Sequence, residues 1–411
     1  MTPETAAAYS LLNAQAVRDR AHRMLAIGLD DKLPNFRVDL TRLLDAAERT
    51  LAATRKAYPT LDVPFHSRWR HFVFEGSDRW AGIDRATQWH DPAVQARAAF
   101  DLAMVSVLLD AGAGPRWHYR DPASGKAIGR SEGLALASLD MFTGGAFSSN
   151  HDKPLQADAE GLMHLTNDAV RGGFQVSGTN PLVGVDGRAD LLRRLGACVA
   201  AKPEIFAIND VSRPGGLFDH LAALANGKTL PAATILSELL LHFGSIWPSR
   251  LTLGGVPLGD CWRHPALTTA DATSELVPLH KLSQWLAYSL IEPLQRAGIS
   301  VTEIDGLTGL AEYRNGGLFV DTGVLTFRDP ADAAREHDVG SPLVVEWRAL
   351  TVALLDRLAD IIRQKLNMDA GTLPLAKVLE GGTWAAGRAI ARELRSDGSP
   401  PVKVISDGTV F

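Results

Sequence analysis

Apolar residues recur every three or four positions along most of this chain, which is the period of an amphipathic helix. Asp91 and Pro92 supply the N-cap and first-turn residues of one such helix, and Ser131 is the expected cap of another. The segments that we expect to be helical are 3–27, 38–58, 91–112, 131–142, 157–170, 190–201, 215–225, 231–246, 279–290, 342–367 and 374–395.

Strand patterns are few and short. Residues 117–119 and 127–129 flank a turn and predict a hairpin, and 318–327 has strand character. The end of the chain, 401–411, has the same character, and we expect it to pair with 318–327. We therefore predict a mainly α fold with small β additions. No linker or repeat divides the chain, so we expect one domain over 1–411, with bracing helices in 1–60, a core in 61–330 and a C-terminal part in 331–411.

The stretch 250–324 concentrates the polar chemistry of the chain. A Gly-Pro-rich turn carries Asp260 and Trp262, and the helix that follows carries Lys281, Gln284 and Tyr288 on one stripe. Glu312-Tyr313-Arg314 then precedes Gly316-Gly317, where we expect a short helix to stop. Carboxylates and cations brought together in this way predict a site, although a helix with one solvated face would show the same pattern.

A second group of charged and aromatic residues lies in 66–72, where Arg68, Trp69 and Arg70 are consecutive. Arginine offers a fork to phosphate and tryptophan offers a flat face, so this segment suits an anionic, planar ligand. A surface loop whose arginine stems cover apolar surface is the alternative interpretation.

Composition narrows the class of partner. The 411 residues are 46% hydrophobic and 22% charged, which is ordinary for a globular protein. A net charge of -5 argues against binding duplex nucleic acid through a basic surface. Two cysteines form no disulfide framework, the first residues lack a signal-peptide pattern, and no apolar run approaches membrane-spanning length. We expect a cytoplasmic protein without a membrane partner, of undetermined oligomeric state.

Several catalytic and cofactor motifs are missing. The glycine-rich loop 172–181 has neither Walker nor dinucleotide-binding spacing, and the zinc-protease and nucleophile-elbow motifs are absent. Cys261 and His264 have the spacing of a metal-ligand pair, but a second recognisable pair does not accompany them. We therefore predict neither a metal nor a cofactor.

Segments spread over nearly the whole chain resemble the uracil-catabolism protein four family. They are His66 to Phe72, Gly114 to Tyr119 with Gly129 to Gly133, Pro214-Gly215-Gly216, the 250–324 stretch, Gly381 to Arg388 and the terminal Ser406 to Phe411. This resemblance implies a role in pyrimidine breakdown, on a route that converts uracil to a nucleotide and then opens the ring. Cleavage of a ribosylurea-type intermediate is the step that it suggests for this family.

Pro278 to Leu286 and Leu307 to Arg314 are similar in order and spacing to queuosine-phosphate N-glycosidase. That resemblance implies a helical core related to helix-hairpin-helix DNA glycosylases, with Glu312 at a position where the glycosidase has aspartate. Both resemblances imply hydrolysis of an N-glycosidic bond to ribose 5-phosphate. Such a reaction builds positive charge on the sugar, which a fixed carboxylate stabilises.

The resemblances suggest a role for each candidate residue. Glu312 is the expected catalytic carboxylate. Asp260 is expected to contact the ribose hydroxyls or to serve as a second acid, and an ordinary turn residue is the alternative. The substrate is expected to be a small, phosphate-bearing, nucleotide-like molecule, held by Lys281, His280, Arg314, Tyr313, Arg68, Arg70, Trp69 and Trp262. Two other functions stay open, a metal-dependent amidohydrolase acting on a ureido group and a protein that binds pyrimidine intermediates without turnover.

Overall fold

A computed structural model of the chain describes residues 1–226, 228–247 and 251–405. These residues fall into two compact units. Unit 1 comprises the described residues of Met1–His66, Ser249–Gln284 and Glu303–Ser406, and unit 2 those of Ser67–Pro248 and Trp285–Thr302. The expected three-part division of a single domain stays a prediction.

The helices of unit 1 are α1 (Pro3–Ser10), α2 (Ala14–Leu29), α3 (Leu43–Ala57), α14 (Tyr313–Asp321), α15 (Pro342–Leu366), α16 (Leu375–Val378) and α17 (Trp384–Leu394), with the first turn of α13 (Lys281–Arg296). Its strands are β1 (Phe36–Val38), β9 (Thr252–Leu253), β10 (Val256–Pro257), β11 (Cys261–Arg263), β12 (Leu276–Pro278), β14 (Leu325–Phe327), β15 (Glu336–Asp338) and β16 (Lys403–Ile405).

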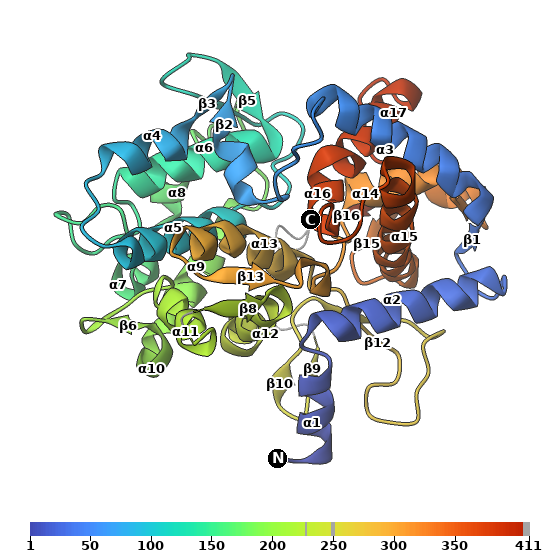
Figure 1. The fold of residues 1–411 in the computed structure, drawn as a ribbon, viewed down its shortest axis with the longest axis horizontal. Helices are drawn as coiled ribbons and strands as arrows, with labels where there is room; N and C mark the ends of the chain where they lie inside the picture. Colours follow the sequence, from blue (N-terminus) through green and yellow to red (C-terminus); the bar gives the residue numbers. More distant parts are fainter. Residues whose placement is uncertain (227, 248–250, 406–411) are drawn as a thin grey trace. The chain divides into compact units, whose positions relative to one another are not determined.

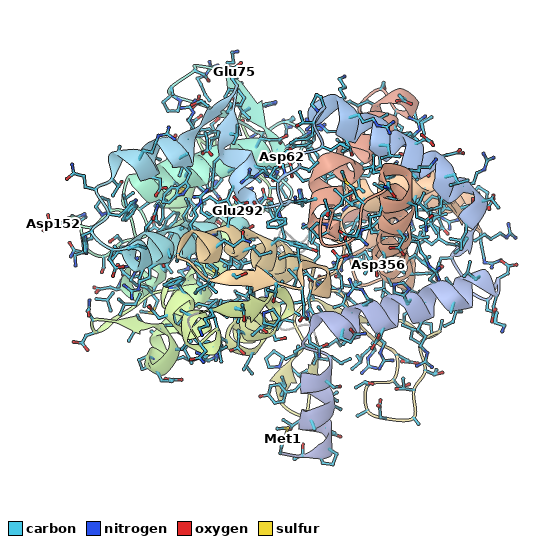
Figure 2. All side chains as sticks on the ribbon, viewed as in Figure 1. Met1, Asp62, Glu75, Asp152, Glu292 and Asp356 are labelled. Atoms are coloured by element: carbon cyan, nitrogen blue, oxygen red, sulfur yellow. The ribbon has the colours of Figure 1, made fainter. Side chains whose placement is uncertain are left out.

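The long helix α15 is the centre of unit 1, with α2, α3 and α14 packed against it (Figure 1). Its first half is buried all round, which agrees with the apolar run that predicts it. Asp356 of α15, labelled in Figure 2, links α15 to α2. Its carboxylate accepts hydrogen bonds from His22 at 2.7 Å and from Arg18 at 3.0 Å.

The helices of unit 2 are α4 (Arg79–Ala86), α5 (Pro92–Leu108), α6 (Arg130–Thr143), α7 (Ala159–Met163), α8 (Asn167–Gly173), α9 (Val185–Ala200), α10 (Pro203–Phe206), α11 (Gly216–Leu224), α12 (Ala232–Phe243) and the rest of α13. Its strands are β2 (Val73–Phe74), β3 (Ser77–Asp78), β4 (His118–Arg120), β5 (Ala127–Gly129), β6 (Ala207–Ile208), β7 (Val211–Ser212), β8 (Thr229–Pro231) and β13 (Ser300–Thr302). Helix α5 is its most buried helix and packs against α6, α9 and α11.

The predicted fold class, mainly α with small β additions, is confirmed, and each sheet in the described residues has two strands. The hairpin is also confirmed, since β4 pairs with β5 and Tyr119 lies opposite Ile128. Asp91 caps α5 by accepting the Ala93 N–H, as its position predicts. The helix-hairpin-helix detail stays a prediction.

Three local predictions of unit 1 are wrong, and a fourth, the helix over 374–395, is confirmed with one irregular turn. The helix over 3–27 is two helices, because the Asn13 side chain caps a new start by accepting the Ala16 N–H at 2.8 Å. The helix over 374–395 contains a π-helical turn at Leu379–Thr383. Residues 318–321 belong to α14, so the strand is only β14, which pairs with β1. Strand β16 pairs in parallel with β15 and not with 318–327. The prediction failed because the alternation of residues within a strand does not specify which strand it pairs with.

Two predictions about helix ends are also wrong. Helix α14 does not stop at Gly316 and Gly317 but runs through both. A Cβ at Gly316 would lie 2.6 Å from the Trp347 ring, so glycine at this position permits close packing and does not end the helix. Ser131 does not cap α6, because its hydroxyl donates to Asp110 at 2.7 Å and the N-cap position is Gly129. The terminal motif 406–411 lies outside the described residues.

Candidate functional site

The 250–324 stretch contributes a buried polar cluster to unit 1. Asp260 lies in the turn before β11, and its carboxylate accepts two hydrogen bonds from Arg348 of α15, at 2.8 and 2.7 Å. The Trp262 indole N–H, at 2.6 Å, and the Lys281 backbone N–H, at 2.9 Å, donate to the same carboxylate. Burial acts to raise the pKa of Asp260, but the Arg348 charge and these hydrogen bonds outweigh it and hold that pKa well below its ordinary value. Asp260 is therefore an anchored anion.

Glu312 is the N-cap of α14 and the second carboxylate of the cluster. One of its oxygens accepts the Arg314 backbone N–H at 2.7 Å, and the other accepts that of Asn315. Only 7% of Glu312 is exposed, and this burial raises the pKa of its carboxyl against the opposing effects of the two amides and of the Lys281 and Arg314 charges. Each carboxylate oxygen retains the capacity to accept one further hydrogen bond.

His280 immediately precedes α13, and Lys281 is its first residue. The backbone N–H groups of both residues donate hydrogen bonds to Asp260. The His280 N–H donates to the Asp260 carbonyl at 3.1 Å, and the His280 ring Nε2 donates to the Leu11 carbonyl at 3.0 Å. Because a carbonyl only accepts, Nε2 carries the proton and Nδ1 presents a lone pair. That Nδ1 is buried and has no hydrogen-bond partner among the described residues. Burial lowers the pKa of His280.

Arg314 and Tyr313 serve the packing of unit 1. The Arg314 guanidinium donates to the Gly398 carbonyl at 2.9 Å and lies 5.0 Å from the centre of the Tyr313 ring. Its backbone carbonyl is so close to α17 that a Cβ at Gly387 would lie 2.1 Å from it. Gly387 therefore permits a close contact between α14 and α17. The role of Arg314 as a phosphate ligand stays a prediction.

Arg68, Trp69 and Arg70 belong to unit 2, in a short 3₁₀ helix (Arg68–Phe72). Arg68 is fully buried and forms an ion pair with Asp110 at 3.0 Å. The Trp69 indole donates to the Ser289 carbonyl at 2.7 Å, and Arg70 donates at 2.6 Å to Glu292, which Figure 2 labels. Arg68 and Trp69 are therefore core residues, which the surface-loop interpretation does not predict; their ligand-binding roles stay predictions.

Within the described residues, Cys261 and His264 belong to no group of three or more possible metal ligands. Cys261 is fully buried, and burial raises the pKa of its thiol. The His264 ring faces Glu346 at 3.2 Å, and that carboxylate also accepts the Phe36 backbone N–H at 2.7 Å. A broad surface hollow of about 670 Å³ in unit 1, lined in part by Asp45, Arg49 and Asp321, contains none of the predicted site residues.

Sequence reasoning missed Arg348 and a trio in unit 2. Arg348 was detectable as a charge inside the apolar start of the helix predicted at 342–367. In the described ranges, the one group of three or more His, Cys, Asp or Glu side chains close enough to share an ion is His220, Glu238 and His242. Glu238 and His242 are four apart on a predicted helix, but His220 lies on another helix, which concealed the trio.

The fold and the site together define a mostly helical protein with a cluster of buried carboxylates. Its residues 10–411 match the profile of the family described as "Protein of unknown function (DUF1688)", and the chain belongs to that family. It is 40% identical over 423 residues to Protein urg3 of Schizosaccharomyces pombe, with both chains fully covered. It is 37% identical over 416 residues to Uracil catabolism protein 4 of Lachancea kluyveri, with 92% of each chain covered. No helix in the described ranges is long and apolar enough to cross a membrane.

Proposed function

We propose that this protein acts in uracil catabolism and hydrolyses the N-glycosidic bond of a ring-opened pyrimidine nucleotide, releasing urea and ribose 5-phosphate from ribosylurea phosphate. The pathway is supported by the name of the relative Uracil catabolism protein 4. The observation that carries the reaction is Glu312, a buried carboxylate that unit 1 fixes in place and whose pKa burial raises.

The proposed step uses these properties of Glu312 directly. Water attacks the anomeric carbon as the bond to the urea nitrogen breaks, and positive charge develops on the sugar. A fixed carboxylate in a poorly hydrated place stabilises that charge without reorganising. A carboxyl with a raised pKa is also a stronger base, so Glu312 can take a proton from the attacking water and return it to the leaving nitrogen.

The other members of the cluster orient the reaction. Asp260 is committed to Arg348 and Trp262, so we assign it to holding the first turn of α13 rather than to proton transfer. Lys281, 9% exposed, supplies a positive charge that stabilises the Glu312 carboxylate, and we propose that it also contacts the substrate phosphate. The His280 Nδ1 lone pair is available to a hydroxyl or N–H donor of the substrate.

The test is an assay of the purified full chain with ribosylurea phosphate, in which urea and ribose 5-phosphate are followed by mass spectrometry. We expect Glu312→Gln to lower kcat/KM by about 10²- to 10⁴-fold, the range for loss of a general base. Glutamine keeps an acceptor for the helix cap, and far-ultraviolet circular dichroism checks the fold. Asp91→Asn is the matched control, because it neutralises an exposed N-cap carboxylate of α5.

The outcomes separate the competing functions. Release of both products by the wild type and the control, but not by folded Glu312→Gln, supports the proposal. Binding of the substrate without turnover favours a non-catalytic binding protein. Turnover that survives Glu312→Gln removes Glu312 from the mechanism, and release of ammonia in place of urea indicates an amidohydrolase.

A further inference from the structure

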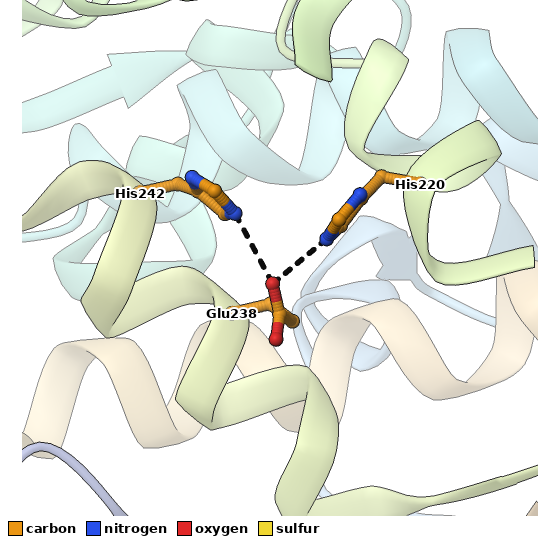
Figure 3. Close-up of side chains that lie close together, drawn as sticks. All are labelled: His220, Glu238 and His242. Atoms are coloured by element: carbon orange, nitrogen blue, oxygen red, sulfur yellow. Dashed lines mark hydrogen bonds and ion pairs between the residues drawn. The ribbon is translucent and has the colours of Figure 1, made fainter. Parts of the chain in front are cut away.

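Two helices of unit 2 bring three metal-binding side chains together. His220 lies on α11, and Glu238 and His242 lie one turn apart on α12. The two imidazole Nε2 atoms face the same carboxylate oxygen, Glu238 Oε2, at 2.8 Å from His220 and 3.1 Å from His242 (Figure 3). All three possible donor atoms lie within 4.8 Å of one another.

These separations fit a common ion. Imidazole nitrogens and carboxylate oxygens bind Zn²⁺ at about 2.0–2.2 Å, so two donors at the tetrahedral angle around one ion are about 3.4 Å apart. The nitrogen–oxygen separations of 2.8 and 3.1 Å are slightly shorter, and small side-chain rotations would open them to admit an ion. The His220 and His242 rings are nearly perpendicular, at 88°, with centroids 5.2 Å apart, and the Nε2 atoms of both rings face Glu238 Oε2.

The charge around Glu238 also favours binding of a cation. Its side chain is only 18% exposed, yet within the described ranges its ionic partners are the two histidines. Two other covered carboxylates of unit 2 pair with arginine, Asp110 with Arg68 and Glu292 with Arg70, whereas Asp158 accepts hydrogen bonds from backbone amides and Gln156. Lys202 lies nearby but donates to the His242 backbone carbonyl at 2.6 Å. Burying a carboxylate without a full positive charge is costly, and a divalent ion supplies that charge.

We propose that His220, Glu238 and His242 bind a divalent first-row transition-metal ion such as Zn²⁺. The set of two imidazoles and one carboxylate suits Zn²⁺ and its neighbours rather than Ca²⁺ or Mg²⁺. Each neutral imidazole would offer its Nε2 lone pair to the ion and carry its single ring proton on Nδ1, so no net proton is lost from a neutral ring. Three protein ligands leave a coordination position for water or a substrate oxygen, as in catalytic zinc sites. The side chains of His220 and His242 are 23% and 12% exposed, so solvent reaches the group.

The site is independent of the proposed function, since it needs no turnover to be tested. The full chain is stripped with a chelator and titrated with Zn²⁺ by calorimetry, and the bound metal is counted after gel filtration by mass spectrometry. We expect one equivalent per chain. Glu238→Gln, His220→Ala and His242→Ala should each weaken binding at least about tenfold, because each removes a ligand.

The chain offers a matched control. Glu160 and His164 have the same four-residue spacing but are both exposed, and His164 Nδ1 contacts the Glu160 backbone carbonyl at 2.9 Å. Glu160→Gln and His164→Ala should bind Zn²⁺ as the wild type does. Cys198→Ser tests the nearest thiol, which donates to the His242 carbonyl at 3.1 Å, and should also leave the stoichiometry unchanged.

Co²⁺ provides a second readout that does not depend on affinity alone. Bound Co²⁺ gives a visible spectrum that reports nitrogen and oxygen ligands, and the spectrum should change in all three ligand variants. Absence of a Zn²⁺ equivalent in the wild type overturns the proposal. Full occupancy in Glu238→Gln and both histidine variants, or loss of the ion in Cys198→Ser alone, overturns it equally.

Discussion

The polar cluster of unit 1 and the histidine group of unit 2 treat buried charge in opposite ways. In unit 1, Arg348 neutralises Asp260 inside the protein, and backbone amides hold Glu312. In unit 2, the ionic partners of Glu238 among the described residues are two histidines. Their imidazole rings carry no charge unless they are protonated. Internal pairing makes a rigid support for a reactive group, whereas incomplete pairing leaves room for an external cation.

The largest expected effect comes from breaking the internal pair. Asp260→Asn should lower the free energy of unfolding by about 3–5 kcal/mol, because it leaves the buried Arg348 charge uncompensated. The isosteric change Glu238→Gln should lower it by no more than about 1 kcal/mol in metal-free protein, since only hydrogen bonds to histidine weaken. Urea unfolding of the chelator-treated variants measures both.

Equal losses in these two variants would contradict the difference between the clusters. Arg348→Met adds a second check in unit 1. It should destabilise as Asp260→Asn does, and the double variant should lose less than the sum of the single losses, because both changes remove the same interaction.

A smaller effect is expected from the helix contact behind Glu312. Gly387→Ala places a Cβ 2.1 Å from the Arg314 carbonyl, so α14 and α17 must separate, at a cost of about 1–3 kcal/mol. Gly187→Ala in α9 is the control, because nothing lies within 4 Å of its Cβ; alanine there should stabilise by about 0.5–1 kcal/mol. Thermal unfolding measures both changes, and a stable Gly387→Ala protein would show that this contact is loose.

The smallest effect concerns pH and His280. Burial lowers the pKa of His280 in the folded protein, so the unfolded chain takes up a proton first as pH falls through about 6.5. Stability is therefore lost below that pH, by at most about 1.4 kcal/mol per pH unit. His280→Gln should flatten the decline between pH 7 and 5, as followed by urea unfolding. The exposed His164→Gln should leave the slope unchanged, and an unaltered slope in His280→Gln would contradict the assignment.

Much of the helical framework was predictable, because burial imposes a period on the residues. The helix predicted at 342–367 agrees with α15 to within one residue, and the Asp91 cap is where its residue type indicates. The sequence did not reveal where glycine serves packing. Gly316 in α14 is required by Trp347, a residue about thirty positions later, so local propensity alone suggested a helix end.

The functional roles of the candidate residues stay predictions, but their contacts can be compared with the sequence pattern. Asp260, His280, Lys281 and Glu312 all lie in the stretch that the residue pattern singled out. Arg348 donates to Asp260 and to the carbonyl of Ala311, the residue before Glu312, and the backbone N–H groups of His280 and Lys281 donate to Asp260. The role of Asp260 as an anchor depends on that partner, which lies 88 positions away. The trio of unit 2 depends likewise on α11 and α12 meeting, which no local pattern encodes.

The division of the chain has a consequence for how the protein is made. Unit 1 is assembled from three separated stretches, and its central contact joins α2 to α15 across more than three hundred residues. On the ribosome, the first of these stretches emerges long before its partners, whereas residues 67–248 of unit 2 emerge together. Helix α1 packs against β9 and β10, whereas the apolar faces of α2 and α3 stay uncovered until α15 has been made. A truncated chain ending before α15 would leave those faces exposed to aggregation and to chaperones.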